Sequence, residues 1–352
     1  MSPFFKKVIQ YFIIIIIGGG FMYYVFKDQD WTELWVRIKS ANPFWLLIAM
    51  FVSLFSHWLR AYRAIMMYDA MGYKIKTSNS FYAVIIGYMM NYFIPRAGEV
   101  ARCASLSKSD DLPMEKSLGS VVTERLFDLI IMFLLLGLVF LIQFQLIWDF
   151  IQKSLANNQP QQSTGLPIKS IILSIFVLFF IILFSLRNKI KALPIFDKIS
   201  GILKGFMDGL LSIKNVKKPF LFLFLSVSIW ACYILMMYFC FFALPSTEHI
   251  SFTACLTVFA IGTIGVALPA PGAGAGTYHY FISQSLLLFG VATVDGVAYA
   301  TMVHGAQMIF IIILGLISSL ILFLKKNKNE DDWEYAKEVE RENDNNNKRI
   351  DY

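Results

Sequence analysis

The chain has 352 residues, of which 57% are hydrophobic and 16% are charged, and its formal net charge is +7. Soluble domains carry about 25% charged residues, so this composition excludes an ordinary soluble enzyme and indicates a surface that faces lipid. The positive charge does not indicate binding to nucleic acid, because the basic residues lie between hydrophobic segments, where they report membrane orientation.

Six apolar segments are long enough to cross a bilayer, which takes about 20 residues of helix. In chain order they are residues 9–26, 43–62, 119–142, 168–186, 219–243 and 297–324. Two further apolar segments are interrupted, residues 80–107 by Pro95 and Gly98, and residues 252–290 by a proline- and glycine-rich sequence at 269–276. Both interruptions predict turns, because proline ends a helix and glycine permits a sharp change of direction.

The distribution of lysine and arginine predicts which loops are cytoplasmic. Residues 187–218 carry eight basic residues, whereas residues 143–167 carry only Lys153. Lysines also flank the hydrophobic region at both of its ends. We therefore expect both termini in the cytoplasm and the loop 143–167 outside. Each interrupted segment then begins and ends on the same side of the membrane.

This pattern predicts an all-α polytopic membrane protein with six transmembrane helices and two re-entrant helical hairpins. Residues 1–147 and 165–324 both contain, in order, a span, a span, a hairpin and a span, but in opposite orientations, which is the inverted repeat typical of secondary transporters. We expect a single integral membrane domain over residues 1–325. Residues 326–352 are polar and asparagine-rich, so we expect a mostly disordered cytoplasmic tail.

The first interrupted segment carries a candidate binding site around its turn, at Asn91, Arg96, Gly98, Glu99 and Arg102. A half-helix that begins near Gly98 would offer free backbone N–H groups and a positive dipole end to an anion, and Arg96 would add a planar cation. Glu99 and Arg102 lie one helical turn apart and can pair. The alternative is a cytoplasmic loop whose charges are simply solvated.

A second charged group, Glu124, Arg125 and Asp128, lies near the start of the span at residues 119–142. Charges at membrane depth are costly and usually face partners or a wet cavity, so we expect this group to share one pocket with the charged residues of the first turn. No histidine accompanies the carboxylates, which argues against a metal site. A purely structural set of ion pairs is the alternative.

The second interrupted segment contributes Gly274, Gly276, Tyr278 and His279 as candidates for the other side of the binding site. Its small residues allow close approach of backbones, and the half-helix after the turn points its N-terminus into the membrane. His279 can titrate near neutral pH or bind a head group, although a lone histidine is more often a packing residue. We expect this turn to approach the first one near the bilayer midplane.

Other polar residues lie on the spans themselves. His57, Arg60 and Arg63 recur at helical spacing near the inner end of the second span, where we expect an interfacial role for side chains that snorkel to the head groups. His304 in the last span is a candidate to face the cavity. The sequence contains no His-Glu-x-x-His, Walker or Gly-x-Ser-x-Gly motif, so we expect no catalytic residues, metal or cofactor.

The two charged motifs resemble those of a known family. Residues 91–102, with Pro95-Arg96-Ala97-Gly98-Glu99, and the sequence Glu124-Arg125-Leu126-Phe127-Asp128 are similar to the transmembrane region of lysylphosphatidylglycerol synthases, which also occurs alone as a flippase-like protein of bacteria and archaea. The resemblance covers about residues 5–325 and implies a bacterial cytoplasmic-membrane protein that moves a lipid or lipid-linked molecule between leaflets.

The residues to which this resemblance gives a role are Arg96, Gly98, Glu99, Arg102, Glu124, Arg125 and Asp128. It does not extend to the cytosolic synthase domain of the bifunctional relatives, so it implies the flippase role and not the synthase activity. Many relatives have a glutamate after the second turn, where this chain has Thr277, Tyr278 and His279. That departure leaves the identity of the substrate open.

Three functions are compatible with these observations. The first is a flippase or related transporter, which would hold a lipid head group between the two turns while the acyl chains stay in the bilayer. The second is a non-transporting membrane partner that presents a lipid to a separate lipid-modifying transferase. The third is an intramembrane enzyme, for which the sequence lacks a nucleophile–base pair. The expected partners are membrane lipids with a phospholipid or lipid-linked head group, and not nucleic acid.

Overall fold

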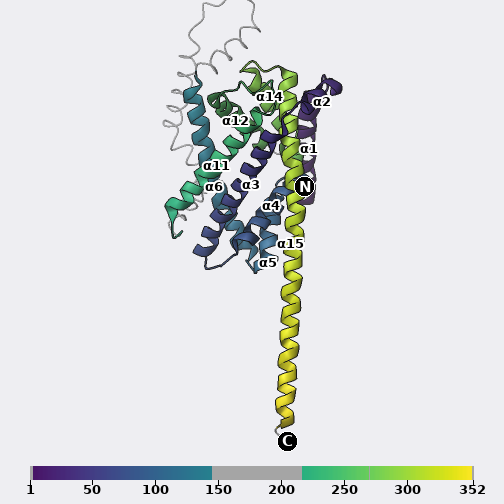
Figure 1. Cartoon of the computed structure of the whole chain (residues 1–352), viewed down its shortest axis with the longest axis vertical. Helices are drawn as coiled ribbons and strands as arrows, with labels where there is room; N and C mark the ends of the chain where they lie inside the picture. Colours follow the sequence, from purple (N-terminus) through teal and green to yellow (C-terminus); the bar gives the residue numbers. More distant parts are fainter. Residues whose placement is uncertain (1–2, 145–215, 269, 351–352) are drawn as a thin grey trace, which may run out of the picture. The chain divides into compact units, whose positions relative to one another are not determined.

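The computed structural model describes residues 3–144, 216–268 and 270–350, and these residues form helices, turns and loops without a strand (Figure 1). Contacts divide the chain into two units, residues 140–214 and the remainder. The helices of the remainder are α1 Pro3–Phe26, α2 Trp31–Lys39, α3 Pro43–Ala70, α4 Thr77–Phe93, α5 Gly98–Asp110, α6 Met114–Ile142 (whose last three residues lie in the other unit), α11 Pro219–Phe241, α12 Phe252–Ala267, α13 Pro271–Gly274, α14 Thr277–Leu287 and α15 Thr293–Ile350.

Four of the described helices are long and apolar enough to cross a membrane: α3, α6, α11 and the Thr293–Lys325 part of α15. Two shorter apolar helical stretches, Ile14–Phe26 of α1 and Phe252–Ala267, accompany them. The described part of the chain is therefore all-helical, and the chain is a multi-pass membrane protein. The predicted span at 168–186 and almost all of the predicted loop at 143–167 lie outside the described residues.

Both interrupted segments fold as pairs of short antiparallel helices, which meet side by side in Figure 1. In the first pair, Asn79 near the start of α4 donates to Asp110 at the end of α5 at 3.0 Å, and Asn91 meets Gly98 at the turn. In the second pair, a Cβ on Gly265 of α12 would lie 3.0 Å from the carbonyl of Thr277 in α14. With 13 residues in α5 and 11 in α14, these helices are about 20 Å long or less, too short to span a bilayer.

Close backbone contact holds the first pair together, because a Cβ added to Gly98 would collide with the carbonyl oxygen of Gly87. The pair also packs against α15, where a Cβ on Gly315 would lie 2.5 Å from the sulfur of Met89. Short side chains at these positions let the helices approach closely, as is usual between helices in membranes. The structure thus presents α4 and α5 as a rigid unit whose turn carries the charged motif.

Tertiary contacts establish which helix ends lie together. At one end, the backbone N–H of Asn42 donates to the carbonyl of Ala243 at 2.8 Å, and Arg37 of α2 pairs with Asp295 of α15. At the other end, the Lys325 ammonium donates to Asn79 at 3.0 Å. Residues 27–42, 243–251 and 288–296 therefore share one end of this unit, and residues 70–77, 108–118, 216–218 and 325 share the other.

The helix α2 has the character of an interfacial segment. Asp30 caps it by accepting from two backbone N–H groups, and Trp31 and Trp35 are exposed on its surface. The hydrogen bonds with Glu33 and Asp295 raise the pKa of Arg37 above its ordinary value. Tryptophan is enriched at the membrane–water boundary, which places α2 at that level.

The C-terminal tail differs from the sequence-based expectation. Its composition predicts mostly disorder over residues 326–352, but α15 continues without a break to Ile350. Residues 326–342 are rich in glutamate and lysine, which have good helix propensity, and they extend a helix that is already nucleated.

Candidate functional site

Five charged side chains from three helices are buried together in this otherwise apolar unit. Arg60 and Arg63 come from α3, Arg102 from α5, and Glu124 and Asp128 from α6. Arg63 is completely inaccessible, and the other four side chains are exposed by 9% or less. Charges at such depth are tolerated only when they are paired or face a wet cavity.

Asp128 is the centre of one half of this network. Its Oδ2 accepts from Arg60 Nη1 and its Oδ1 accepts from Arg63 Nη1, each at 2.9 Å. Arg63 Nη1 also donates to the hydroxyl of Ser226 in α11, again at 2.9 Å, and Arg60 Nη2 donates to the Tyr233 hydroxyl at 3.1 Å. One carboxylate therefore joins α3 and α6, and its two arginines reach α11 in the second half of the chain.

Glu124 is the centre of the other half. Arg102 donates to both of its oxygens, from Nη2 to Oε1 at 2.8 Å and from Nη1 to Oε2 at 3.1 Å. This bidentate geometry is the strongest form of an arginine–carboxylate pair. Arg102 also donates to the Tyr68 hydroxyl at 3.2 Å, and Arg63 Nη2 lies 3.5 Å from Glu124 Oε2. Arg102 thus ties the α5 half of the first hairpin to both α6 and α3.

A third ion pair lies at the edge of the network. Arg125 Nη2 is 3.1 Å from Glu99 Oε1, and its Nη1 is 3.5 Å from Asp128 Oδ2. These two side chains are 45% and 30% exposed, so they sit where the buried network meets the surface. The pair connects the first turn of α5 to α6.

The charges of the network do not cancel among the described residues. Three buried arginines face two buried carboxylates, and with the outer pair included four arginines face three carboxylates. The Nε–H groups of Arg60, Arg63 and Arg102 are buried and have no hydrogen-bond partner in the described part of the chain. The described part of the site therefore carries one unbalanced positive charge and several buried donors without a partner.

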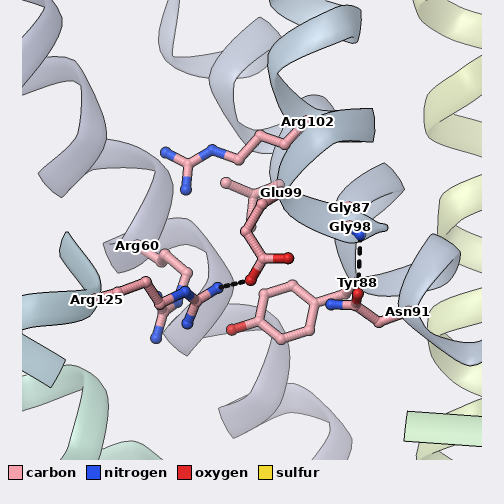
Figure 2. Close-up of a pocket in the computed structure, with 9 residues that line it drawn as sticks. Arg60, Gly87, Tyr88, Asn91, Gly98, Glu99, Arg102 and Arg125 are labelled. Atoms are coloured by element: carbon pink, nitrogen blue, oxygen red, sulfur yellow. Dashed lines mark hydrogen bonds and ion pairs between the residues drawn. The ribbon is translucent and has the colours of Figure 1, made fainter. Parts of the chain in front are cut away.

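A small cleft opens beside this network at the turn of the first hairpin (Figure 2). It is lined by Arg60, Val84, Gly87, Tyr88, Asn91, Gly98, Glu99, Arg102 and Arg125. Its volume is about 20 Å³, which is room for about one water molecule. A lipid head group can enter only if a side chain moves out of the cleft.

Two expectations, one about the first turn and one about the second span, are corrected by this geometry. The Gly98 N–H is not free for an anion, because Asn91 Oδ1 accepts from it at 2.8 Å. Arg60 and Arg63 are not interfacial, because they form the buried core of the network instead of snorkelling to the membrane surface. Their spacing of three residues on an apolar span, matched by two carboxylates four apart on another span, was the signal that could have paired them.

Arg96 lies outside the network. Its side chain is exposed, and within the described residues it makes no ion pair with the carboxylates that were expected to neutralise it. Its backbone has φ of +61°, in the left-handed region that residues other than glycine adopt only at a cost. The expected pocket therefore forms from Glu99, Arg102, Glu124, Arg125 and Asp128 with Arg60 and Arg63, and without Arg96.

The second turn forms a separate aromatic cluster. Gly274 and Gly276 have φ of +97° and +86°, and Tyr278 and His279 are buried behind them. His279 Nδ1 accepts from the Gly276 N–H at 3.3 Å, and its ring centre lies 5.2 Å from that of His304. The residues after this turn thus pack against the last span and do not reach the charged network.

The two turns nevertheless approach each other through that cluster. The short helix α13 packs against α4, and the ring of His304 lies 5.9 Å from that of Tyr92, three residues before Pro95. His304 also lies 5.5 Å from Tyr278 on the other side. His304 therefore faces residues of both hairpins, while its Nε2 is buried without a partner in the described part of the chain.

The sequence of this chain matches the model of a known protein family. The model of the lysylphosphatidylglycerol synthase transmembrane region matches residues 11–315. The chain belongs to this family. Neither the curated proteins nor the solved structures that were searched contain a match. As a member of the transmembrane region family, the chain shares the membrane domain of the synthases, and the matched residues contain no synthase domain.

Proposed function

We propose that this protein moves a lipid or a lipid-linked molecule between the leaflets of a bacterial cytoplasmic membrane. The observation that carries the proposal is the buried, unbalanced ion network beside the cleft of the first hairpin. Membership of a family of flippase-like membrane domains supports the same assignment. The head group would enter the cleft while the acyl chains stay in the bilayer.

The energetics of the network favour a functional role over a purely structural one. A buried ion pair contributes little net stability, because its desolvation offsets its attraction, and well-packed apolar residues would hold the helices together equally well. Ionisable groups inside membrane helices are therefore expected to mark a substrate path. The network also links α3, α5 and α6 to Ser226 and Tyr233 of α11, so a rearrangement at the head group would be transmitted between the two halves of the chain.

Transport can be tested in proteoliposomes that contain a lipid with a fluorescent head group, by adding a membrane-impermeant reductant from outside. Without transport about half of the fluorescence is protected, because half of the lipid faces inward. With transport we expect nearly complete loss of fluorescence from vesicles that contain the protein, and half loss from protein-free vesicles. Equal protection in both preparations, for phosphatidylglycerol, phosphatidylethanolamine and lysylphosphatidylglycerol alike, would contradict the proposal.

The same experiment separates transport from the alternative of a non-transporting partner that presents a lipid to a separate enzyme. Such a partner would bind labelled lipid without exchanging it between leaflets, so the protected half would persist. Measuring binding and protection on the same preparation distinguishes the two functions.

A further inference from the structure

The side chain of Glu99 lies in the middle of the cleft, a position that its ion pair with Arg125 does not by itself require. Figure 2 shows its side chain reaching into the middle of the lining residues, with the Arg102 guanidinium on one side and those of Arg60 and Arg125 on another. Only Arg125 is within ion-pairing distance of Glu99 among the described residues, at 3.1 Å, and both side chains are partly exposed. A carboxylate therefore stands among three guanidinium groups and is held there by one half-exposed ion pair.

The other two buried arginines of the cleft keep hydrogen-bond donors that have no partner among the described residues. Arg60 and Arg102 are 3% and 4% exposed, and each keeps a buried Nε–H without a partner in the described part of the chain. Their other N–H groups are already used by Asp128 and Glu124. The free donors and the excess positive charge thus belong to the side chains that line the cleft.

We propose that this cleft binds the phosphate of an anionic lipid head group, and that Glu99 occupies the place of the phosphate until the lipid displaces it. The proposal rests on the lipid-transport function and names the class of lipid. When Glu99 swings out, four arginines face only Glu124 and Asp128, so the site gains a second unbalanced positive charge. A phosphate then replaces the carboxylate as the partner of Arg125.

The size of the cleft supports the exchange. The cleft, with a volume of about 20 Å³, has no room for a phosphate group beside Glu99, and outward rotation of this partly exposed side chain would free the space of its carboxylate. Arginine suits this role because its planar donors match the oxygens of a phosphate as well as those of a carboxylate. The Asn91 amide keeps the turn closed through Gly98 during the exchange.

Binding can be measured without transport, by native mass spectrometry of the full chain in detergent with added phosphatidylglycerol or diacylglycerol. We expect phosphatidylglycerol to bind more tightly, because diacylglycerol has the same acyl chains and no phosphate. Inorganic phosphate in excess should compete with phosphatidylglycerol if both use the same donors. If inorganic phosphate binds and phosphatidylglycerol does not, the ligand is a soluble anion, and the lipid proposal is wrong.

Two variants test the exchange itself. Glu99→Gln removes the competing carboxylate, so we expect phosphatidylglycerol to bind about fivefold more tightly. Arg125→Gln removes a phosphate donor and should weaken binding about tenfold, with partial recovery in Arg125→Lys. Both side chains are partly exposed, so the folded protein should persist. Lys116→Gln changes the same charge at an exposed position of α6 outside the cleft, and should leave binding unchanged.

The outcomes separate this proposal from the transport function. Equal binding of phosphatidylglycerol and diacylglycerol, or equal effects of Arg125→Gln and Lys116→Gln, would overturn the phosphate site even if lipids still exchange between leaflets. Selective binding that responds to Glu99→Gln as expected would support the site even if proteoliposomes show no exchange, and the transport function alone would then be wrong.

Discussion

Asp128 is the residue on which the buried arginines of α3 depend. It accepts one hydrogen bond from each of Arg60 and Arg63, whereas Glu124 is already engaged by Arg102 in a bidentate pair. A neutral side chain at position 128 would leave two buried guanidinium groups with only distant contact to a carboxylate, at 4.0 and 3.5 Å. Because these guanidinium groups are buried, we expect the stability of the protein to depend on the negative charge of Asp128.

We therefore expect Asp128→Asn to lower the free energy of unfolding by about 3–5 kcal/mol, because breaking a buried pair strands a charge. Heating in detergent followed by size-exclusion chromatography measures the loss of folded protein. Glu99→Gln is the matched control, because it breaks a partly exposed ion pair and should cost about 0–1 kcal/mol. Similar midpoints for both variants would show that the network is hydrated, so that its carboxylates are interchangeable with neutral groups.

Arg96 is under a different constraint, since it is exposed and has φ of +61°. Arg96→Gly removes the guanidinium and suits this backbone conformation, so we expect the variant to be at least as stable as the parent chain. We expect its lipid transport to fall severalfold, because an exposed cation in a strained backbone conformation, three residues before Glu99, is a candidate for contact with an approaching head group. Thermal midpoints and leaflet exchange should be measured on the same preparation. Unchanged exchange would remove Arg96 from the binding site.

At the scale of elements, the first hairpin depends on contact between backbones. The turn between α4 and α5 is closed by Asn91 on Gly98, and the two helices cross where Gly87 meets Gly98. The carbonyl of Gly87 leaves no space for a side chain at position 98. The position of Glu99 and Arg102, which come after Gly98 in the same helix, is therefore set by a residue that has no side chain.

Gly98→Ala should accordingly displace α5 from α4 and pull Arg102 away from Glu124. We expect a clear loss of stability, comparable to overpacking a core at about 1–3 kcal/mol, together with loss of lipid binding. Gly119→Ala in α6 is the control, because a Cβ there meets nothing within 4 Å and alanine favours the helix. If Gly98→Ala is as stable as Gly119→Ala, the two helices do not cross as closely as the structure shows.

At the scale of the whole molecule, the two groups of helix ends differ in positive charge, and this difference predicts which end faces the cytoplasm. The end that contains residues 70–77, 108–118, 216–218 and 325 carries seven lysines, at positions 74, 76, 108, 116, 217, 218 and 325. The opposite end carries Lys27, Arg37 and Lys39 among its described residues. Because positive residues are enriched on the cytoplasmic side, we expect the lysine-rich end to lie there.

Single cysteines at Lys74 and Asp28 test this orientation, because these two residues lie at opposite ends and outside the buried core. The four native cysteines are buried and should label little with a membrane-impermeant maleimide. In intact cells we expect labelling of Asp28→Cys and not of Lys74→Cys, with both labelled after the membrane is opened. Labelling of both from outside would contradict the arrangement of helix ends.

Local chemistry determined much of this protein directly from its sequence. Apolar runs of about 20 residues required membrane helices, since no other open structure satisfies the backbone in lipid. Pro95 and the glycines of the second turn divided two segments into helix pairs, because they set backbone geometry without reference to distant residues. The grouping of Glu99, Arg102, Glu124, Arg125 and Asp128 was also predictable, because a charge in a membrane must find a partner.

Only the tertiary structure decided which charged side chains pair with one another. Arg60 and Arg63 resemble snorkelling residues in sequence, but α3 packs against α11, and the two arginines point inward to Asp128 of α6 and Ser226 of α11. Arg96 resembles a binding residue, but the left-handed turn leaves it exposed. Hydropathy predicts how deep in the membrane a residue of a spanning helix lies. The direction of its side chain depends on how neighbouring helices are rotated about their axes. Contacts between residues far apart in the sequence set that rotation.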